Sequence, residues 1–188
     1  MLNPLAIMLD VDALFPSVVP RSYLIQLGEG ACSYLDLGPN LIVMLSLDLG
    51  SAVRNVTPNE LEKSGISDDE AWAKAMGNLG AQLSGGQLKV GVGEFDDGGK
   101  AIFLDGHWLA SAAIFHNGFY QWFSEQLGSD SLCALISERD SAVIFAEDCS
   151  ALVSEKIESF ISRVELESRK PFGRNLFTLA PEGPVYVG

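Results

Sequence analysis

The segment Leu88–Leu104 reads LKVGVGEFDDGGKAIFL and is the part of the chain that decides the fold class. Two runs typical of β-strands, Leu88–Phe95 and Ala101–Leu104, flank the four residues Asp96-Asp97-Gly98-Gly99. Asp-Gly and Gly-Gly steps between such runs favour a β-hairpin, because glycine supplies the positive φ angles of a tight turn. The sequence therefore predicts two antiparallel strands here.

Further strands are expected outward from this hairpin, each an apolar run bounded by turn residues. Gly28-Glu29-Gly30 is expected to turn the first two of them into a hairpin, and Glu138-Arg139-Asp140 to turn another pair. The run Leu41–Leu49 has the composition of a buried central strand. The expected strands are Tyr23–Leu27, Ala31–Leu37, Leu41–Leu49, Leu132–Ser137, Ala142–Ala146, Arg174–Leu179 and Pro184–Val187.

Helices are expected where apolar residues recur at 3.6-residue spacing or where capping residues mark a start. Thr57 and Ser67 precede two helices, and Glu60 and Glu70, each three residues later, complete capping boxes. Pro16 and Pro20 are expected to end the first helix, and Gly118 to divide the fourth. The expected helices cover 3–15, 58–64, 68–83, 108–127 and 148–167.

Short turns between strands, with helices gathered between the hairpins, predict the fold class. The fold is expected to be α+β, a mainly antiparallel sheet with helices packed on one side. The 188 residues are expected to form a single domain, with a possible subdomain boundary near 84–86, where Ser-Gly-Gly ends a helix.

Charge restricts the function classes. The chain has 25 acidic and 12 basic residues, a net charge of −13. Such a surface opposes binding to phosphates and to anionic lipid, so neither nucleic acid nor membrane is an expected partner. Residues 57–83 have helix-turn-helix spacing, but five acids and two lysines there count against DNA binding. The apolar start, interrupted by Pro4, Asp10 and Asp12, is not typical of a signal peptide, and a cytoplasmic location is expected.

Motifs for known chemistry are not found. The two histidines, His107 and His116, are nine residues apart, and the three cysteines form no C-x-x-C pair, so no metal site and no cofactor is expected. Gly91-Val92-Gly93 is not followed by the third glycine of a dinucleotide fingerprint. The cysteines are interpreted as reduced, buried thiols.

Acidic clusters and aromatic residues are the remaining candidates for contact with a partner. Asp68, Asp69 and Glu70 lie in the first turn of an expected helix, where the helix dipole is a sufficient structural reason for their negative charge. Asp96 and Asp97 are likewise explained by the turn that they are expected to form. The aromatic residues of 108–123 are expected mainly in the core, although tryptophan also anchors interfaces. The partner-binding candidates are Asp68, Asp69, Glu70, Asp96, Asp97, Asp105 and Trp108.

Residues 41–79 read LIVMLSLDLGSAVRNVTPNELEKSGISDDEAWAKAMGNL, and this stretch resembles the YtpQ-like bacterial proteins, a family of unassigned function. The resemblance extends to LDGHWLASAAI, to LCALISERDSAVIFAED and to PFGRNLFTL. It implies an α+β fold made in the bacterial cytoplasm and supplies no reaction, cofactor or catalytic residue.

Three functions are compatible with these observations. The first is a non-catalytic acidic module that docks onto another protein, in its sharpest form an immunity-type inhibitor that neutralises a basic toxin or effector. The second is an enzyme or small-ligand binder that uses dispersed carboxylates, with Asp10, Asp12, Asp105 and His107 as candidates. The third is a housekeeping scaffold of the YtpQ-like kind.

Overall fold

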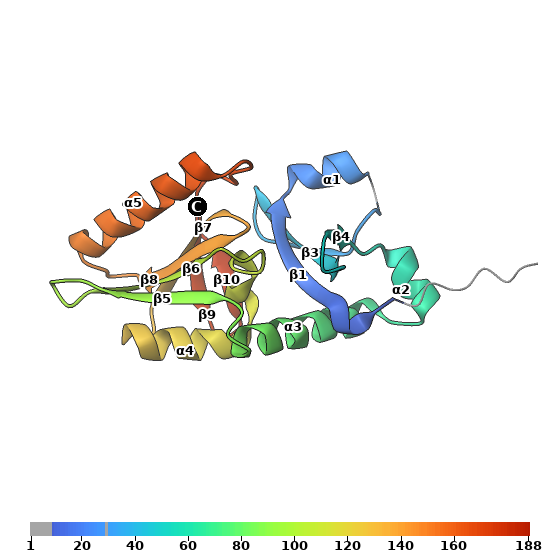
Figure 1. Ribbon diagram of the computed structural model, residues 1–188, viewed down its shortest axis with the longest axis horizontal. Helices are drawn as coiled ribbons and strands as arrows, with labels where there is room; N and C mark the ends of the chain where they lie inside the picture. Colours follow the sequence, from blue (N-terminus) through green and yellow to red (C-terminus); the bar gives the residue numbers. More distant parts are fainter. Residues whose placement is uncertain (1–8, 29) are drawn as a thin grey trace, which may run out of the picture.

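The structure, a computed structural model, describes residues 9–28 and 30–188 and contains two antiparallel sheets (Figure 1). The smaller sheet has the order β1-β3-β2, with β4 also paired to β3. Its central strand is β3, the predicted buried strand, whose first seven residues are buried. The strands are β1 (Leu14–Pro20), β2 (Tyr34–Asp36), β3 (Leu41–Asp48) and β4 (Val53–Asn55).

The larger sheet has six antiparallel strands in the order β10-β9-β7-β8-β6-β5. The three hairpins β5–β6, β7–β8 and β9–β10 lie where the sequence predicts them. Gly98 has φ +81° at the β5–β6 turn, a conformation that favours glycine. The strands are β5 (Lys89–Glu94), β6 (Lys100–Asp105), β7 (Leu132–Glu138), β8 (Ser141–Ala146), β9 (Asn175–Ala180) and β10 (Gly183–Tyr186).

Helices cover both faces of the six-stranded sheet. Helix α5 packs on one face, and α4 and η2 on the other (Figure 1). Among the described residues, none of the helices has the length and apolar composition needed to cross a membrane. The helices are α1 (Ser22–Leu27), α2 (Pro58–Ser64), α3 (Asp68–Ser84), α4 (Asn117–Leu127) and α5 (Ala151–Glu167), with 3₁₀ turns η1 (Val11–Ala13) and η2 (Ser111–Phe115).

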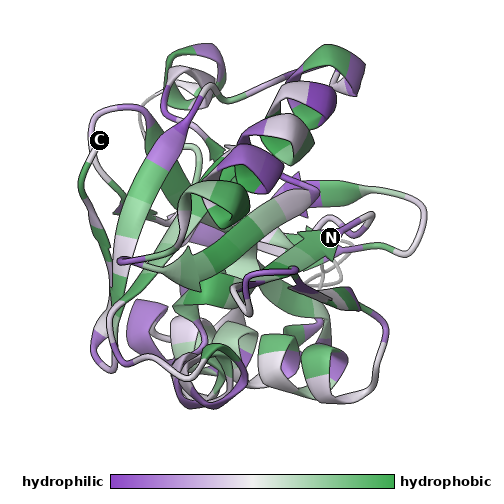
Figure 2. Cartoon of the chain, turned by 90° about the vertical axis from the view of Figure 1, so that its left-hand side faces the viewer, coloured by the Kyte–Doolittle hydropathy of each residue, from purple (hydrophilic) through white to green (hydrophobic). Residues whose placement is uncertain are grey.

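The alternation of side chains along β6 separates two apolar layers. Ile102 and Leu104 face the main core, whereas Ala101 and Phe103 face α5. The main core also contains residues of β1, β3 and α3, so one apolar cluster joins both sheets. Figure 2 shows strands coloured mainly as hydrophobic and helices with alternating hydrophobic and hydrophilic residues. The predicted subdomain boundary at 84–86 falls where the chain leaves α3 for the larger sheet.

The prediction of an α+β fold with mainly antiparallel sheet is confirmed, and α5 adds a covered face that the expected one-sided arrangement of helices did not include. Both predicted capping boxes are present: Thr57 with Glu60 and Ser67 with Glu70.

The predicted hairpin around Gly28 is wrong, because residues 22–27 form α1. Tyr23, Leu24 and Leu27 are half-buried, and their i, i+1, i+4 spacing matches one face of a helix. The predicted strand at 31–37 is reduced to β2, and Gly28 instead ends the helix with φ +90°. A five-residue apolar run is too short for its periodicity to distinguish a strand from a helix.

The expected first helix is also wrong over its described part. Residues 3–8 lie outside the described residues, and Leu14–Pro20 form β1. Pro16 and Pro20 are tolerated because β1 is an edge strand that pairs only with β3, so the missing N–H groups break no second ladder. The expected break at Gly118 falls instead at His116, whose backbone is extended between η2 and α4.

We expect the Asn78 side chain to be important for holding α3 against the start of β1. Its amide donates hydrogen bonds to the carbonyls of Val11 at 2.9 Å and Leu14 at 3.0 Å. Replacing it, N78A, leaves both carbonyls without this donor and is expected to cost about 1–3 kcal/mol of unfolding free energy in urea. The exposed Asn59 provides the control: N59A is expected to change stability by less than about 0.5 kcal/mol. Equal effects of the two substitutions would contradict the assigned role.

Candidate functional site

The acidic start of α3 has mainly a structural role. Asp68 accepts a hydrogen bond from the Ser33 hydroxyl at 2.5 Å, and the same hydroxyl accepts one from the buried Trp72 indole at 3.0 Å. Glu70 accepts from the Ser67 backbone amide at 2.9 Å and from its hydroxyl at 2.7 Å. These bonds from Ser67, side chain first, lower the pKa of Glu70. Of the three candidates here, Asp69 alone is left without a side-chain partner among the described residues.

Asp105 and Trp108 each contact another element of the fold. Asp105 lies 3.8 Å from Arg163 of α5. Trp108 is half-buried against the main core, with its ring edge-to-face on Phe15 at a centroid distance of 5.6 Å. Both side chains therefore connect elements of the fold, and the structure does not place them with the other candidates.

Asp96 and Asp97 lie at one end of the six-stranded sheet, where three loops meet. The loops are the β5–β6 turn (95–99), the α4–β7 loop (128–131) and the β8–α5 loop (147–150). The Glu147 amide donates to the Ser131 carbonyl at 2.9 Å, and Ser150 hydrogen-bonds to Asp97, so the β8–α5 loop contacts both of the other loops. The three loops contain five acidic and no basic residues. We call this the acidic end: Asp96, Asp97, Asp130, Glu147 and Asp148.

A small surface hollow of about 240 Å³ lies between two of these loops. Ser129, Ser131, Glu147 and Asp148 line it. Carboxylates and hydroxyls are hydrogen-bond acceptors for a lysine ammonium or an arginine guanidinium. The hollow therefore has the chemistry and size to receive one basic side chain.

Cys133 and Cys32 are unreactive by their surroundings, whereas the third cysteine, Cys149, is half-buried and so departs from the expectation of buried thiols. Cys133 is buried, and burial, followed by the charge of Glu147 and by Cys149, raises the pKa of its thiol. Burial likewise raises the pKa of Cys32. Both groups are therefore protonated thiols at neutral pH, as expected of structural cysteines.

The residues considered for catalysis each have a local partner. Asp10 accepts from the Asp12 amide at 3.2 Å, and Asp12 forms an ion pair with Lys74 at 2.8 Å. His107 accepts a hydrogen bond on Nδ1 from the Leu109 amide at 3.2 Å. Within residues 9–28 and 30–188, no cluster of three or more His, Cys, Asp or Glu side chains is arranged to hold a metal ion.

His116 packs against α3 at a glycine. A Cβ at Gly80 would lie 2.4 Å from the Nε2 atom of His116, so only glycine leaves space for the ring. The ring also lies edge-to-face on Phe119 at a centroid distance of 5.4 Å. This histidine therefore has a packing role between α3 and α4.

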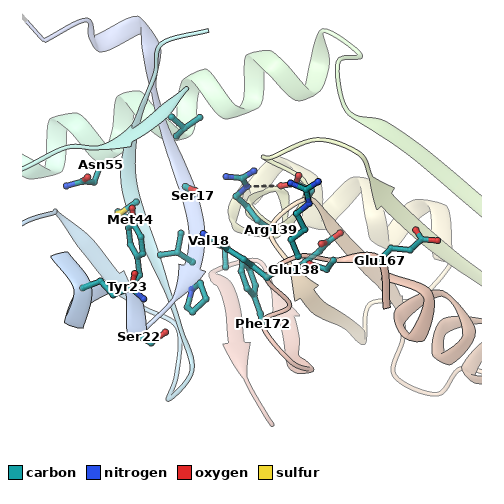
Figure 3. A pocket seen from close by; sticks show the side chains of 18 residues that line it. Ser17, Val18, Ser22, Tyr23, Met44, Asn55, Glu138, Arg139, Glu167 and Phe172 are labelled. Atoms are coloured by element: carbon teal, nitrogen blue, oxygen red, sulfur yellow. Dashed lines mark hydrogen bonds and ion pairs between the residues drawn. The ribbon is translucent and has the colours of Figure 1, made fainter. Parts of the chain in front are cut away.

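Sequence reasoning missed a groove of about 760 Å³ between the two sheets (Figure 3). One wall comes from β1, β3, β4 and α1; the other comes from the β7–β8 turn and the chain that follows α5. The side chains drawn in Figure 3 include Ser17, Tyr23 and Met44 on the first wall and Arg139 and Phe172 on the second. The one sequence feature that belongs to this groove and was identified is the turn Glu138-Arg139-Asp140. Its position opposite the smaller sheet depends on tertiary packing, which the sequence pattern does not show.

No family model, curated protein or solved structure matches the chain. The resemblance to YtpQ-like proteins therefore stays a prediction. Three of its segments nevertheless meet at the β7–β8 turn: Ser111 donates from its hydroxyl to the Arg139 carbonyl at 2.7 Å, and the Phe172 amide donates to the Ser137 carbonyl at 2.6 Å.

We expect the contact between Asp97 and Ser150 to be visible in a titration. The Ser150 hydroxyl and then the Gly99 amide lower the pKa of Asp97 in the folded protein. A lowered pKa stabilises the fold above the unfolded pKa of about 3.9, and this contribution is lost as the pH falls through the folded value. In S150A the pKa of Asp97, measured by NMR of its carboxyl carbon, is expected to rise. An unchanged titration would contradict the contact, and S154A is the control.

Proposed function

We propose that the protein is a non-catalytic module that binds a basic protein partner through its acidic end. In its sharpest form it is an immunity-type inhibitor, made in the bacterial cytoplasm, that binds and neutralises a toxin or effector. The proposal combines the net charge of −13 with the position of the charges. A basic partner is favoured over nucleic acid because carboxylates repel phosphates.

The observation that carries the proposal is the convergence of three loops at the acidic end. Asp96, Glu147 and Asp148 are exposed, and their side chains form no hydrogen bond or ion pair with other described residues. Unpaired exposed carboxylates attract a basic surface and raise its association rate. The hollow beside Glu147 and Asp148 adds a place where one lysine or arginine of the partner is desolvated and held.

The arrangement of the other acidic residues favours a binding role over turnover. Of the carboxylates considered as catalytic, Asp10 and Asp12 lie at η1 and Asp105 ends β6, and each contacts a local partner. A general acid and base that act on one substrate must both reach it, which needs convergent groups. The acidic end has convergent carboxylates, but they point outward from loops.

The test compares two variants with equal changes of charge. D96N/E147Q/D148N removes three unpaired carboxylates of the acidic end, and E62Q/D69N/E182Q removes three exposed ones elsewhere that also have no side-chain partner among the described residues. Affinity purification with wild-type protein and both variants as baits is expected to yield a basic protein that the first variant fails to retain.

The purified partner then allows a kinetic measurement. We expect the association rate to fall about tenfold or more for the acidic-end variant at low ionic strength and by much less for the control, with the difference reduced by salt. A partner that is retained equally by both variants would remove the acidic end from the proposal. If all three baits retain the same proteins at background level, the proposed function itself fails.

A further inference from the structure

The groove between the sheets lies at the opposite end of α5 from the acidic end. The β8–α5 loop precedes this 17-residue helix, and Glu167, Ser168, Arg169 and Lys170 at its other end line the groove. A helix of that length extends about 25 Å, so the two surfaces are separate. What the groove binds is therefore independent of the proposed partner.

Positive side chains gather in this groove although the chain is acidic. Arg139, Arg169 and Lys170 all line it. In the described part of the chain, Arg169 and Lys170 form no ion pair, and Arg139 uses its Nε atom on Asp140 at 2.7 Å. The terminal nitrogens of that guanidinium are free of hydrogen bonds to described residues. Unpaired cations at the wall of a groove are available to an oxyanion.

Three carboxylates also line the groove, and two of them are occupied. Asp140 pairs with Arg139, and Glu167 pairs with Arg163 at 3.4 Å. Glu138 has no hydrogen bond or ion pair among the described residues and is the one carboxylate left to repel an anion. The groups without partners therefore favour a negatively charged ligand.

The cationic wall is held in place by main-chain bonds. The Gly106 amide donates to the Asp140 carbonyl at 3.0 Å, and both the amide and the hydroxyl of Ser111 donate to the Arg139 carbonyl, at 3.1 and 2.7 Å. The bond from the Phe172 amide to the Ser137 carbonyl ties the segment after α5 to the same turn. These bonds fix the backbone from which the cations extend, which lowers the entropy lost on binding.

The opposite wall combines apolar surface with one buried polar group. Met44 and Tyr23 supply its apolar and aromatic lining, and Phe172 adds an aromatic ring from the cationic wall. Ser17 is 2% exposed and adds a hydroxyl to the lining of the groove. The apolar and aromatic lining is a second feature, independent of charge, and it favours a ligand with an organic body.

We propose that the groove binds a small organic anion, in which a carboxylate or phosphate group is attached to an apolar or aromatic body. The oxyanion lies against Arg139, Arg169 and Lys170, and the body lies between Tyr23 and Phe172 near the Ser17 hydroxyl. Carboxylate and phosphate share the geometry that a guanidinium recognises, and the experiment distinguishes them.

The probes are phenyl phosphate and phenylacetate, with benzyl alcohol and benzylamine as neutral and cationic counterparts. Titration into ¹⁵N-labelled wild-type protein is expected to give saturable shifts of the amides of residues 17–26, 138–140 and 169–172 with the anionic probes alone. The tighter of the two anions identifies the oxyanion class. Equal binding of benzyl alcohol, or shifts elsewhere in the protein only, would overturn the proposal.

Variants that remove a positive or a negative charge from the groove are expected to change the affinity for the anionic probe in opposite directions. R169Q/K170Q is expected to weaken binding of the anionic probe about tenfold or more, from the loss of charge-assisted hydrogen bonds. K89Q/K156Q removes two cations that are likewise without ion pairs in the described residues, and it is expected to bind as the wild type does. E138Q is expected to strengthen binding about two- to threefold, because it removes the free carboxylate. Equal weakening in R169Q/K170Q and K89Q/K156Q, or weaker binding by E138Q, would contradict the proposed site. If a variant misfolds, the chemical shift changes of the wild-type protein still test the proposal.

Discussion

The burial of α3 and η2 in one apolar core with both sheets is the packing on which the rest of the structure depends. Leu79 of α3 and Ala112 of η2 are fully buried in the cluster that also holds Leu45 of β3 and Ile102 of β6. The walls of the groove belong to different sheets, so this shared core sets the distance between them. Loss of packing in this core would change the shape of the groove more than that of the acidic end, because the acidic end is built on the larger sheet alone.

The surplus of acidic residues divides into those that the fold uses and those that it leaves free. Glu60 and Glu70 close capping boxes at helix starts, where negative charge also complements the helix dipole. Asp97 closes a turn, and Glu158 binds Arg174 at 2.7 Å. A chain with 25 acids can therefore tolerate its self-repulsion, because several of them accept hydrogen bonds from backbone amides or pair with basic side chains. The carboxylates without such a role are the ones whose position indicates a function.

Local signals in the sequence were sufficient for most elements and insufficient for the site. The Asp-Asp-Gly-Gly turn and the capping boxes depend on residues within five positions of one another, and the structure contains all of them. The errors occur where local signals are insufficient: Pro16 is acceptable only because β1 is an edge strand, and the run at 22–27 is too short for its spacing to distinguish a helix from a strand. Asp96 and Asp97 could be selected from the sequence, but their approach to Glu147 and Asp148 depends on the order of strands in the sheet.

The two surfaces have opposite electrostatic requirements within one chain. A net charge of −13 repels an anion at long range, which disfavours a groove that binds one. At physiological ionic strength, however, the screening length is about 8 Å, and charges at the far end of α5 lie well beyond it. The field inside the groove is therefore set by its own lining, where Arg169 and Lys170 lack ion pairs among the described residues and Glu138 alone opposes them. Screening therefore lets an acidic docking end and an anion-binding groove coexist. Salt weakens repulsion by the whole chain more than it weakens the short-range bonds, so binding in the groove depends less on ionic strength than binding at the acidic end does.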